Sequence, residues 1–176
     1  EVQRKIAIEA FRRQRMEEPL EQYIANFDEY QGKVEELLEA TLDLSDLGSQ
    51  ITSVLTDSKL LETFRYLAGP PISEDDLKVV AEAALSRQRV LQDADMVERI
   101  RQVVLSGLDR RRFPWVIEGR EPTESERQAA VIASAALIAT RRLETARRSD
   151  GKKEQETTVH VALKVAGFEQ VASRRV

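Results

Sequence analysis

The stretch EPLEQYIANFDEYQGKVEELLEAT, residues 18–41, decides the fold class of this 176-residue chain. From Leu20 to Thr41 the residues of one face recur every three or four positions, which is the period of an amphipathic helix, and they do so for about six turns. The acidic residues of the stretch lie on the other face. We therefore predict a mainly α chain, organised as a bundle-like domain of several helices.

Further helical patterns flank this stretch and are separated by glycine and proline breaks. They predict helices over residues 2–16, 49–55, 59–67, 73–85, 94–105, 124–148 and 154–165. Thr123 and Glu126 have the spacing of a capping box at the start of the helix over 124–148. The pair Asp150-Gly151 is expected to break the chain between the last two. Residues 168–176 alternate and predict a single C-terminal strand, whose partners are expected after Val176 because one strand is not stable alone. These elements predict a helical N-terminal domain over 1–148 and the start of a second domain over 149–176.

The composition excludes several classes of site. Hydrophobic residues make up 41% of the chain and charged residues 33%, a balance typical of a helical globular domain. Because there is no cysteine and His160 is the single histidine, disulfides, thiolate metal sites and histidine-cluster zinc sites are excluded. No apolar run reaches the roughly 18 residues that span a bilayer. No basic-then-apolar leader opens the chain, so a cytoplasmic location is expected.

Charge is distributed unevenly along the chain. Ten acids and one lysine between Glu17 and Asp46 give that segment a charge of −9, so the rest of the chain carries +5 within the net charge of −4. Arginine and lysine bind phosphate, and a nearby tryptophan can stack on a base. We therefore predict that two basic clusters face DNA: Arg110, Arg111 and Arg112 beside Trp115, and Arg141, Arg142, Arg147, Arg148, Lys152 and Lys153.

Each basic cluster also has a structural alternative. The three arginines could bridge neighbouring helices and cap backbone carbonyls, with Trp115 as a core side chain. The second cluster could pair with the acidic segment and not with a phosphate backbone. The sequence leaves both alternatives open.

No complete active site is encoded in the chain. It contains neither a Gly-rich phosphate loop nor a Gly-x-Ser-x-Gly elbow. Two carboxylate-rich spots exist, at residues 74–76 and 35–36, but they fall at a predicted helix start or on an outer face. Acids are common there because they interact with the helix dipole or with water. We therefore expect no metal ion or other cofactor to be held by this chain alone.

Many short segments, in order along nearly the whole chain, carry a family resemblance. They are FRRQRMEEPL at 11–20, FDEY at 27–30, LAGPPISEDDL at 67–77, LDRRRFPWV at 108–116, EGREPT at 118–123, ASAAL at 133–137 and GKKEQE at 151–156. Together they resemble the N-terminal part of the XamI family of type II restriction endonucleases. The resemblance implies an enzyme that cuts duplex DNA at a short palindrome, uses Mg²⁺ and acts as a homodimer.

The resemblance also implies a catalytic core of the PD-(D/E)xK type. Residues 154–176 would form its first helix and first strand. The chain holds no Pro-Asp followed by a strand-borne Glu-x-Lys, so the main catalytic residues would follow Val176. Some nucleases of this fold add a carboxylate from the first helix, and Glu154 or Glu156 is the position expected to supply it here. The chain itself would then support DNA engagement or dimerisation.

Functions of two other classes remain open at this point. A non-enzymatic helical protein-interaction module would be complete at about Val176 and would pair with its partner through the stripe from Leu20 to Leu42. A regulator that binds DNA without cutting it would use the same basic clusters.

Overall fold

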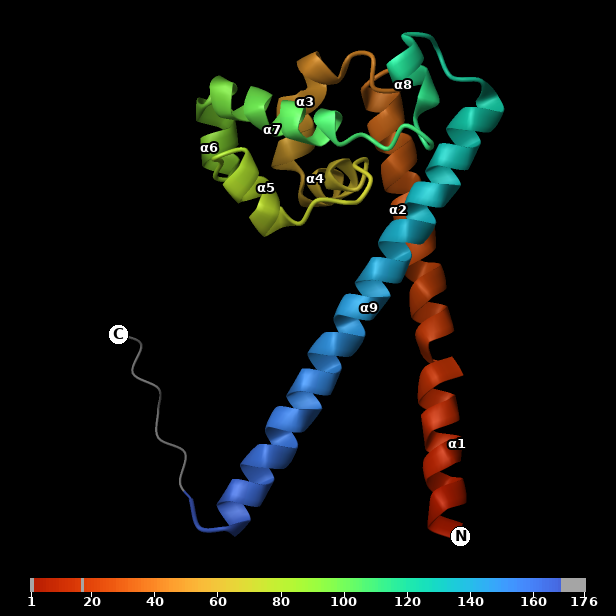
Figure 1. The fold of residues 1–176 in the computed structure, drawn as a ribbon, viewed down its shortest axis with the longest axis vertical. Coiled ribbons are helices and arrows are strands. Elements are labelled where there is room, and N and C mark those ends of the chain that lie inside the picture. The colour runs from red at the N-terminus through yellow and green to blue at the C-terminus, as the bar shows by residue number, and fades with distance from the viewer. Residues whose placement is uncertain (1, 17, 169–176) are drawn as a thin grey trace. The chain divides into compact units, whose positions relative to one another are not determined.

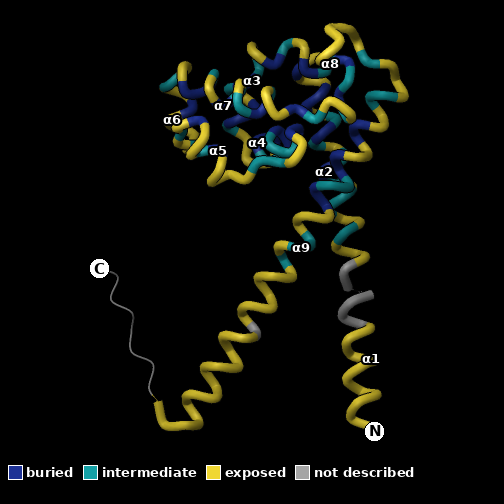
Figure 2. Tube along the Cα trace, in the orientation of Figure 1, coloured by how far each residue is buried: buried dark blue, intermediate teal, exposed yellow. Residues whose placement is uncertain are grey.

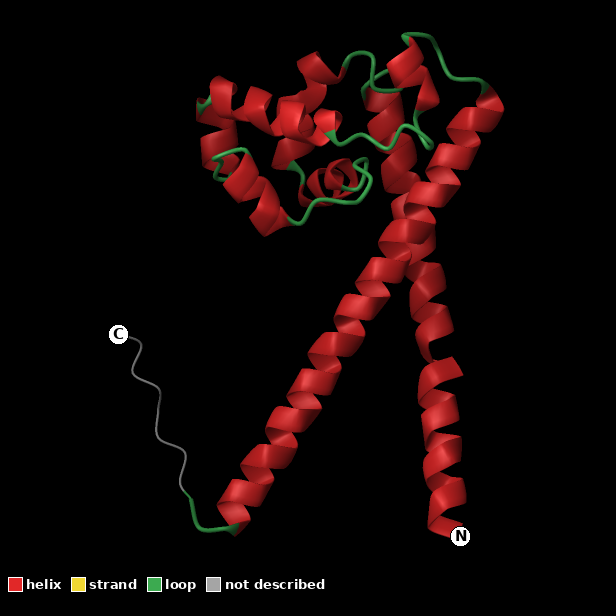
Figure 3. Cartoon of the chain, in the orientation of Figure 1, coloured by secondary structure: helices red, strands yellow, loops and turns green. Residues whose placement is uncertain are grey.

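The described part of the chain is helical throughout its regular structure. The computed structural model describes residues 2–16 and 18–168, without the side chains of residues 13–19 and 154. The prediction of a mainly α chain is consistent with this structure (Figures 1 and 3). The helices are α1 Val2–Met16, α2 Glu18–Ala40, α3 Leu47–Thr56, α4 Ser58–Arg65, α5 Glu74–Val80, α6 Arg87–Gln92, α7 Ala94–Ser106, α8 Pro114–Glu118 and α9 Glu124–Val165.

The predicted C-terminal strand is wrong. The described residues contain no strand, and α9 continues through Asp150 and Gly151 to Val165. One exposed glycine costs a helix only about 1 kcal/mol, and the arginines, lysines and glutamates around it favour the helix. The helix ends at Val165 and is capped by Gly167, whose φ of 88° is left-handed, and the Phe168 amide donates to the Leu163 carbonyl at 3.0 Å. Phe168 therefore closes a helix, and the remaining residues of the predicted strand, 169–176, lie outside the described residues.

The chain forms two compact units, Glu1–Thr140 and Arg141–Val176. The predicted domains, 1–148 and 149–176, stay a prediction. In the first unit α4 packs on α2 and α3, and α3 also contacts α6 and α7. None of the helices in the described ranges is long and apolar enough to cross a membrane.

The stripe of α2 fills the core of the first unit. Tyr30, Val34, Leu37 and Leu38 are completely buried, and Figure 2 shows the second half of α2 as the buried part of that helix. The interaction-module alternative uses the stripe from Leu20 to Leu42 to bind a partner protein. The second half of that stripe is already packed against other helices of this chain. The first half is open, since Leu20 and Ile24 are exposed.

A tight turn links α2 to α3 and is held by distant residues. Leu42, Asp43 and Leu44 all have positive φ angles, a left-handed conformation that costs energy for residues other than glycine. The Trp115 indole of α8 donates to the Asp43 carbonyl at 2.9 Å. The Arg127 guanidinium of α9 donates to the Asp43 carboxylate at 2.8 Å. The turn is thus fixed by side chains from two later helices.

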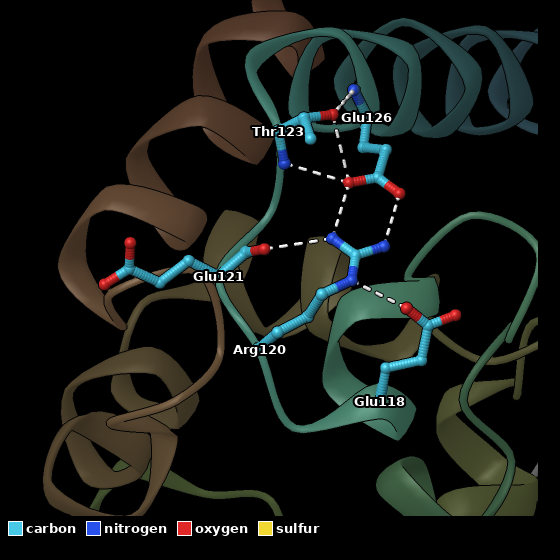
Figure 4. Close-up of polar contacts among 5 residues, drawn as sticks. All are labelled: Glu118, Arg120, Glu121, Thr123 and Glu126. Atoms are coloured by element: carbon cyan, nitrogen blue, oxygen red, sulfur yellow. Dashed lines mark hydrogen bonds and ion pairs between the residues drawn. The ribbon is translucent and has the colours of Figure 1, made fainter.

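The start of α9 confirms the capping-box spacing of Thr123 and Glu126. The Thr123 amide donates to the Glu126 carboxylate at 2.9 Å, and the Glu126 amide donates to the Thr123 hydroxyl at 3.3 Å. Figure 4 shows that Arg120 joins this network. Its guanidinium contacts Glu126 at 2.6 Å and Glu118 at 2.6 Å. The hydrogen bonds from Arg120, followed by that from the Thr123 amide, lower the pKa of Glu126 to about 2.

This network predicts a pH dependence of stability. A glutamate whose pKa is lowered in the folded state stabilises the fold above its ordinary pKa of 4.5, and the stabilisation is lost as pH falls from there toward 2. We expect Glu126→Gln to be less stable than the parent chain at neutral pH and to match it more closely as the pH approaches 2. Denaturation midpoints measured across this range test the expectation. Glu124→Gln, in the same first turn, serves as the control, and a Glu126→Gln deficit that stays constant with pH contradicts it.

Candidate nucleic-acid interface

The larger basic cluster lies on the C-terminal part of α9, in the second unit. All six of its arginine and lysine residues between Arg141 and Lys153 are exposed (Figure 2). Arg141, Arg148 and Lys152 share one face of the helix, because spacings of seven and eleven residues are close to whole turns. At about 1.5 Å a residue these three positions span about 16 Å along the helix axis. We call the six residues the basic segment of α9.

Part of the charge of the basic segment is paired locally. Arg141 lies 3.1 Å from Glu144, and Lys152 lies 3.7 Å from Glu156. Arg142 also has an interaction within the chain. Exposed pairs three or four residues apart contribute only about 0.3–0.5 kcal/mol. A phosphate could therefore compete for these side chains at little cost.

The remaining three charges of the basic segment are unpaired within the described part of the chain. Among the described residues, the Arg147, Arg148 and Lys153 side chains make no hydrogen bond or ion pair. An exposed helix that carries several unneutralised cations attracts a polyanion over a distance of about one Debye length, roughly 8–10 Å in physiological salt. These three residues are therefore the candidates in this segment for contacts with phosphate.

The three arginines at residues 110–112 differ in their exposure to solvent. Arg110 and Arg111 are exposed, whereas the Arg112 side chain is 11% exposed. The Arg112 guanidinium donates to the Asp109 carboxylate at 2.8 Å, to the Ser134 hydroxyl at 2.9 Å and to the Tyr66 and Ala68 carbonyls at 2.8 and 3.0 Å. Arg112 therefore bridges neighbouring segments and caps backbone carbonyls, which is the structural role considered above. We leave it out of the surface considered for DNA.

Asp109 fixes the turn that presents the two exposed arginines. Its carboxylate accepts from the Arg111 amide at 2.9 Å and from the Arg112 amide at 3.3 Å. Burial alone would raise the pKa of Asp109, but the Arg112 guanidinium and these two amides together hold it below its ordinary value. Asp109 thus stays ionised at neutral pH and keeps Arg110 and Arg111 at a defined place on the surface of the first unit.

Trp115 is a core side chain. It is 1% exposed, its ring contacts Phe113 edge to face at 5.5 Å between centroids, and its indole N–H is used by the Asp43 carbonyl. A base cannot stack on a ring that is covered in this way. Stacking beside the arginine cluster is therefore excluded for Trp115 in this structure.

Of the two carboxylates named as candidate catalytic groups, only Glu156 is described with its side chain, and among the described residues it belongs to no metal site. Glu156 is exposed and lies next to Lys152, while the side chain of Glu154 is outside the described residues. In the part of the chain that the structure describes, no three acidic or histidine side chains converge on a common point. His160 is also exposed. The described residues therefore do not fit Mg²⁺ by themselves.

A further set of exposed basic residues lies outside the two clusters predicted to face DNA. Arg4, Lys5 and Arg12 lie on α1, and all of its described side chains are exposed. Lys5 and Arg12 are seven residues apart and so share a face with Ile8 between them. This spacing is visible in the sequence, but it also fits an ordinary helix with a buried face.

Comparison of the sequence with known proteins finds matches to a family profile and to one curated relative. The profile of the XamI restriction endonuclease family matches residues 45–176. A type II restriction enzyme XamI from Xanthomonas campestris pv. amaranthicola is 37% identical over 160 residues, which cover 86% of this chain and 56% of the relative. The chain thus spans about half the length of the curated relative that it matches. No solved structure matches it.

Proposed function

Because the chain belongs to the XamI restriction endonuclease family, we propose that it is a helical region that engages DNA and pairs two subunits of a type II restriction enzyme. The whole enzyme would be a homodimer that cuts duplex DNA at a short palindrome, since a two-fold partner matches a two-fold site. It would act in the cytoplasm, where its substrate lies.

The exposed basic segment of α9 is the observation that carries the DNA-engaging role. Its three unpartnered cations, Arg147, Arg148 and Lys153, can each contact a phosphate without first breaking a contact within the described residues. Arg110 and Arg111, held by the Asp109 turn, are a second proposed contact. Such contacts position a protein on a duplex and carry no base sequence directly. The role proposed for the chain is therefore affinity and placement on DNA.

The chemistry of cleavage is assigned to other residues of the whole enzyme. Mg²⁺ would polarise the scissile phosphate and help to generate the attacking hydroxide when it is bound. The described residues do not form a site for it, so we derive no catalytic step from this chain. Glu154 and Glu156 stay predicted positions for one added carboxylate.

Two matched charge reversals test the DNA-engaging role. We expect the double variant Arg147→Glu/Arg148→Glu to bind a short DNA duplex about 100-fold more weakly, because two phosphate contacts become repulsive. The control is Arg87→Glu/Arg89→Glu, which makes the same change in net charge at two exposed residues of α6. Fluorescence anisotropy of a labelled duplex measures both affinities.

The two variants distinguish a local contact with DNA from a general effect of net charge. Equal weakening by both pairs would mean that only net charge matters, and an unchanged affinity of the α9 variant would remove the basic segment from the interface. If the segment pairs with the acidic residues 17–46, its reversal should instead lower the denaturation midpoint with no change in DNA affinity. Each of these results contradicts the proposal.

A further inference from the structure

The N-terminal helix α1 buries none of its described apolar side chains, which is unusual for a helix of this length. Every described side chain of α1, residues 2–12, is exposed (Figure 2). The exposed fractions reach 60% for Ile6, 41% for Ile8 and 61% for Phe11. Helices of about 15 residues are marginal in water and depend on packing for most of their stability. The exposed Ile6, Ile8 and Phe11 therefore leave α1 with an apolar surface that packing against a partner would stabilise.

The first half of α2 is open in the same way but carries the opposite charge. Leu20 is 54% exposed and Ile24 is 43% exposed. Glu21 and Asp28 are exposed beside them, and residues 20–31 contain no arginine or lysine. Among the described residues, neither carboxylate makes an ion pair or hydrogen bond. The exposed apolar residues at the start of α2 are thus flanked by acids, whereas those of the preceding helix α1 are flanked by bases.

We propose that α1 docks on the first half of α2 of a second copy of this chain, with the two helices antiparallel. This inference rests on the homodimer proposed above and names its interface. An antiparallel alignment that sets Lys5 against Asp28 also sets Arg12 against Glu21, because both pairs are seven residues apart on their helices. The same alignment places Arg4 beside Asp28. A parallel pairing of α1 with α1 would bring bases against bases.

The apolar residues fit the same alignment. It brings Ile8 beside Ile24 of the second copy, so that two exposed isoleucines cover each other between the charged pairs. An apolar centre with charges at its edges is the usual composition of a protein interface. A phosphate backbone, by contrast, would leave Ile8 and Phe11 against the solvent or the anions. These apolar residues favour a protein surface over DNA as the occupant.

Two charge-reversal variants and their mixture test the interface. The basic-face variant is Arg4→Glu/Lys5→Glu/Arg12→Glu, and the acidic-face variant is Glu21→Lys/Asp28→Lys. Sedimentation measurements on the 20.0 kDa chain report self-association, and the fluorescence of buried Trp115 reports that the first unit is folded. We expect the parent chain to dimerise and each variant alone to dimerise about 100-fold more weakly, because each places like charges together.

The mixture of the two variants separates this interface from packing of α1 within its own chain. Mixing the variants in equal amounts should restore dimers, since each α1 then meets an α2 of opposite charge. Variants that stay monomeric when mixed overturn the inference, because α1 would then pack on its own chain. A parent dimer that neither variant weakens also overturns it, although the homodimer itself would stand. A parent chain that is monomeric, but loses duplex affinity in the basic-face variant, would assign α1 to DNA and overturn both the interface and the subunit-pairing role proposed for this chain.

Discussion

Replacement of Arg112 by alanine should lower the free energy of unfolding by about 3–5 kcal/mol, the range for breaking a buried charge network on one side. The guanidinium joins the loop after α4, the turn before α8 and the buried Ser134 hydroxyl of α9. Without it, the Tyr66 and Ala68 carbonyls lose this donor, and the Asp109 carboxylate keeps only the Arg111 and Arg112 backbone amides. Partly buried acceptors without donors each cost about 1–3 kcal/mol. Urea denaturation followed by Trp115 fluorescence measures the loss.

Arg111 provides the matched control for this prediction. It is adjacent in sequence, carries the same charge and is exposed. Arg111→Ala should change stability by less than about 0.5 kcal/mol, as is usual for surface positions. Arg112→Lys should recover only part of the loss because an ammonium cannot match the planar fork that reaches several acceptors. Equal effects of Arg111→Ala and Arg112→Ala would contradict the role given to Arg112.

Replacement of Trp115 by alanine should destabilise the first unit by about 3–5 kcal/mol, the cost of a large cavity in a core. The ring is 1% exposed and packs edge to face on Phe113. Its indole N–H also satisfies the Asp43 carbonyl in a turn whose residues have positive φ angles. The loss should therefore loosen the link between α2 and α3. Far-ultraviolet circular dichroism measures the unfolding, since the fluorescent residue is removed.

Trp115→Phe separates packing from hydrogen bonding. It keeps an aromatic ring beside Phe113 but leaves the Asp43 carbonyl without its donor, so we expect a smaller loss of about 1–3 kcal/mol. A phenylalanine variant as unstable as the alanine variant would show that the hydrogen bond matters more than the volume. An alanine variant within about 0.5 kcal/mol of the parent would contradict the placement of Trp115 in the core.

The elements that the sequence predicted well are those with a strong local signal. The stripe of α2 has a regular period over many residues, and Tyr30, Val34 and Leu37 are buried as that period requires. The capping box of Thr123 and Glu126 is likewise a local pattern with a known geometry. Neighbouring residues alone form the capping box, whereas the period of the stripe predicts a helix face but not its cover, because Leu20 and Ile24 of the same face are exposed.

The predictions that failed depended on what lies beyond neighbouring residues. Gly151 resembled a helix end, but nothing next to it competes with the helix, and α9 passes through it. Phe168 began an alternating segment, yet its amide closes α9. Arg111 and Arg112 cannot be told apart in the sequence, because the carbonyls that bind Arg112 come from residues more than forty positions earlier. Only the folded chain brings those partners together.

The exposure of the basic segment of α9 has a different basis. All six of its basic residues are exposed, so their charge in the sequence is also their charge at the surface. The open face of α1, for which docking is proposed, was not predicted because the same residues fit an ordinary amphipathic helix. Its exposure is a property of the fold and could not be inferred from the period alone.

The salt dependence of duplex binding tests the central claim most directly. The affinity of the chain for a short DNA duplex is measured by anisotropy over a series of sodium chloride concentrations. We expect the logarithm of the association constant to fall linearly with the logarithm of salt, with a slope of about −3 to −5 for three to five phosphate contacts. Arg147→Glu/Arg148→Glu should bring the slope about two units closer to zero. A parent chain whose binding is undetectable or insensitive to salt would contradict the proposal that this region engages DNA.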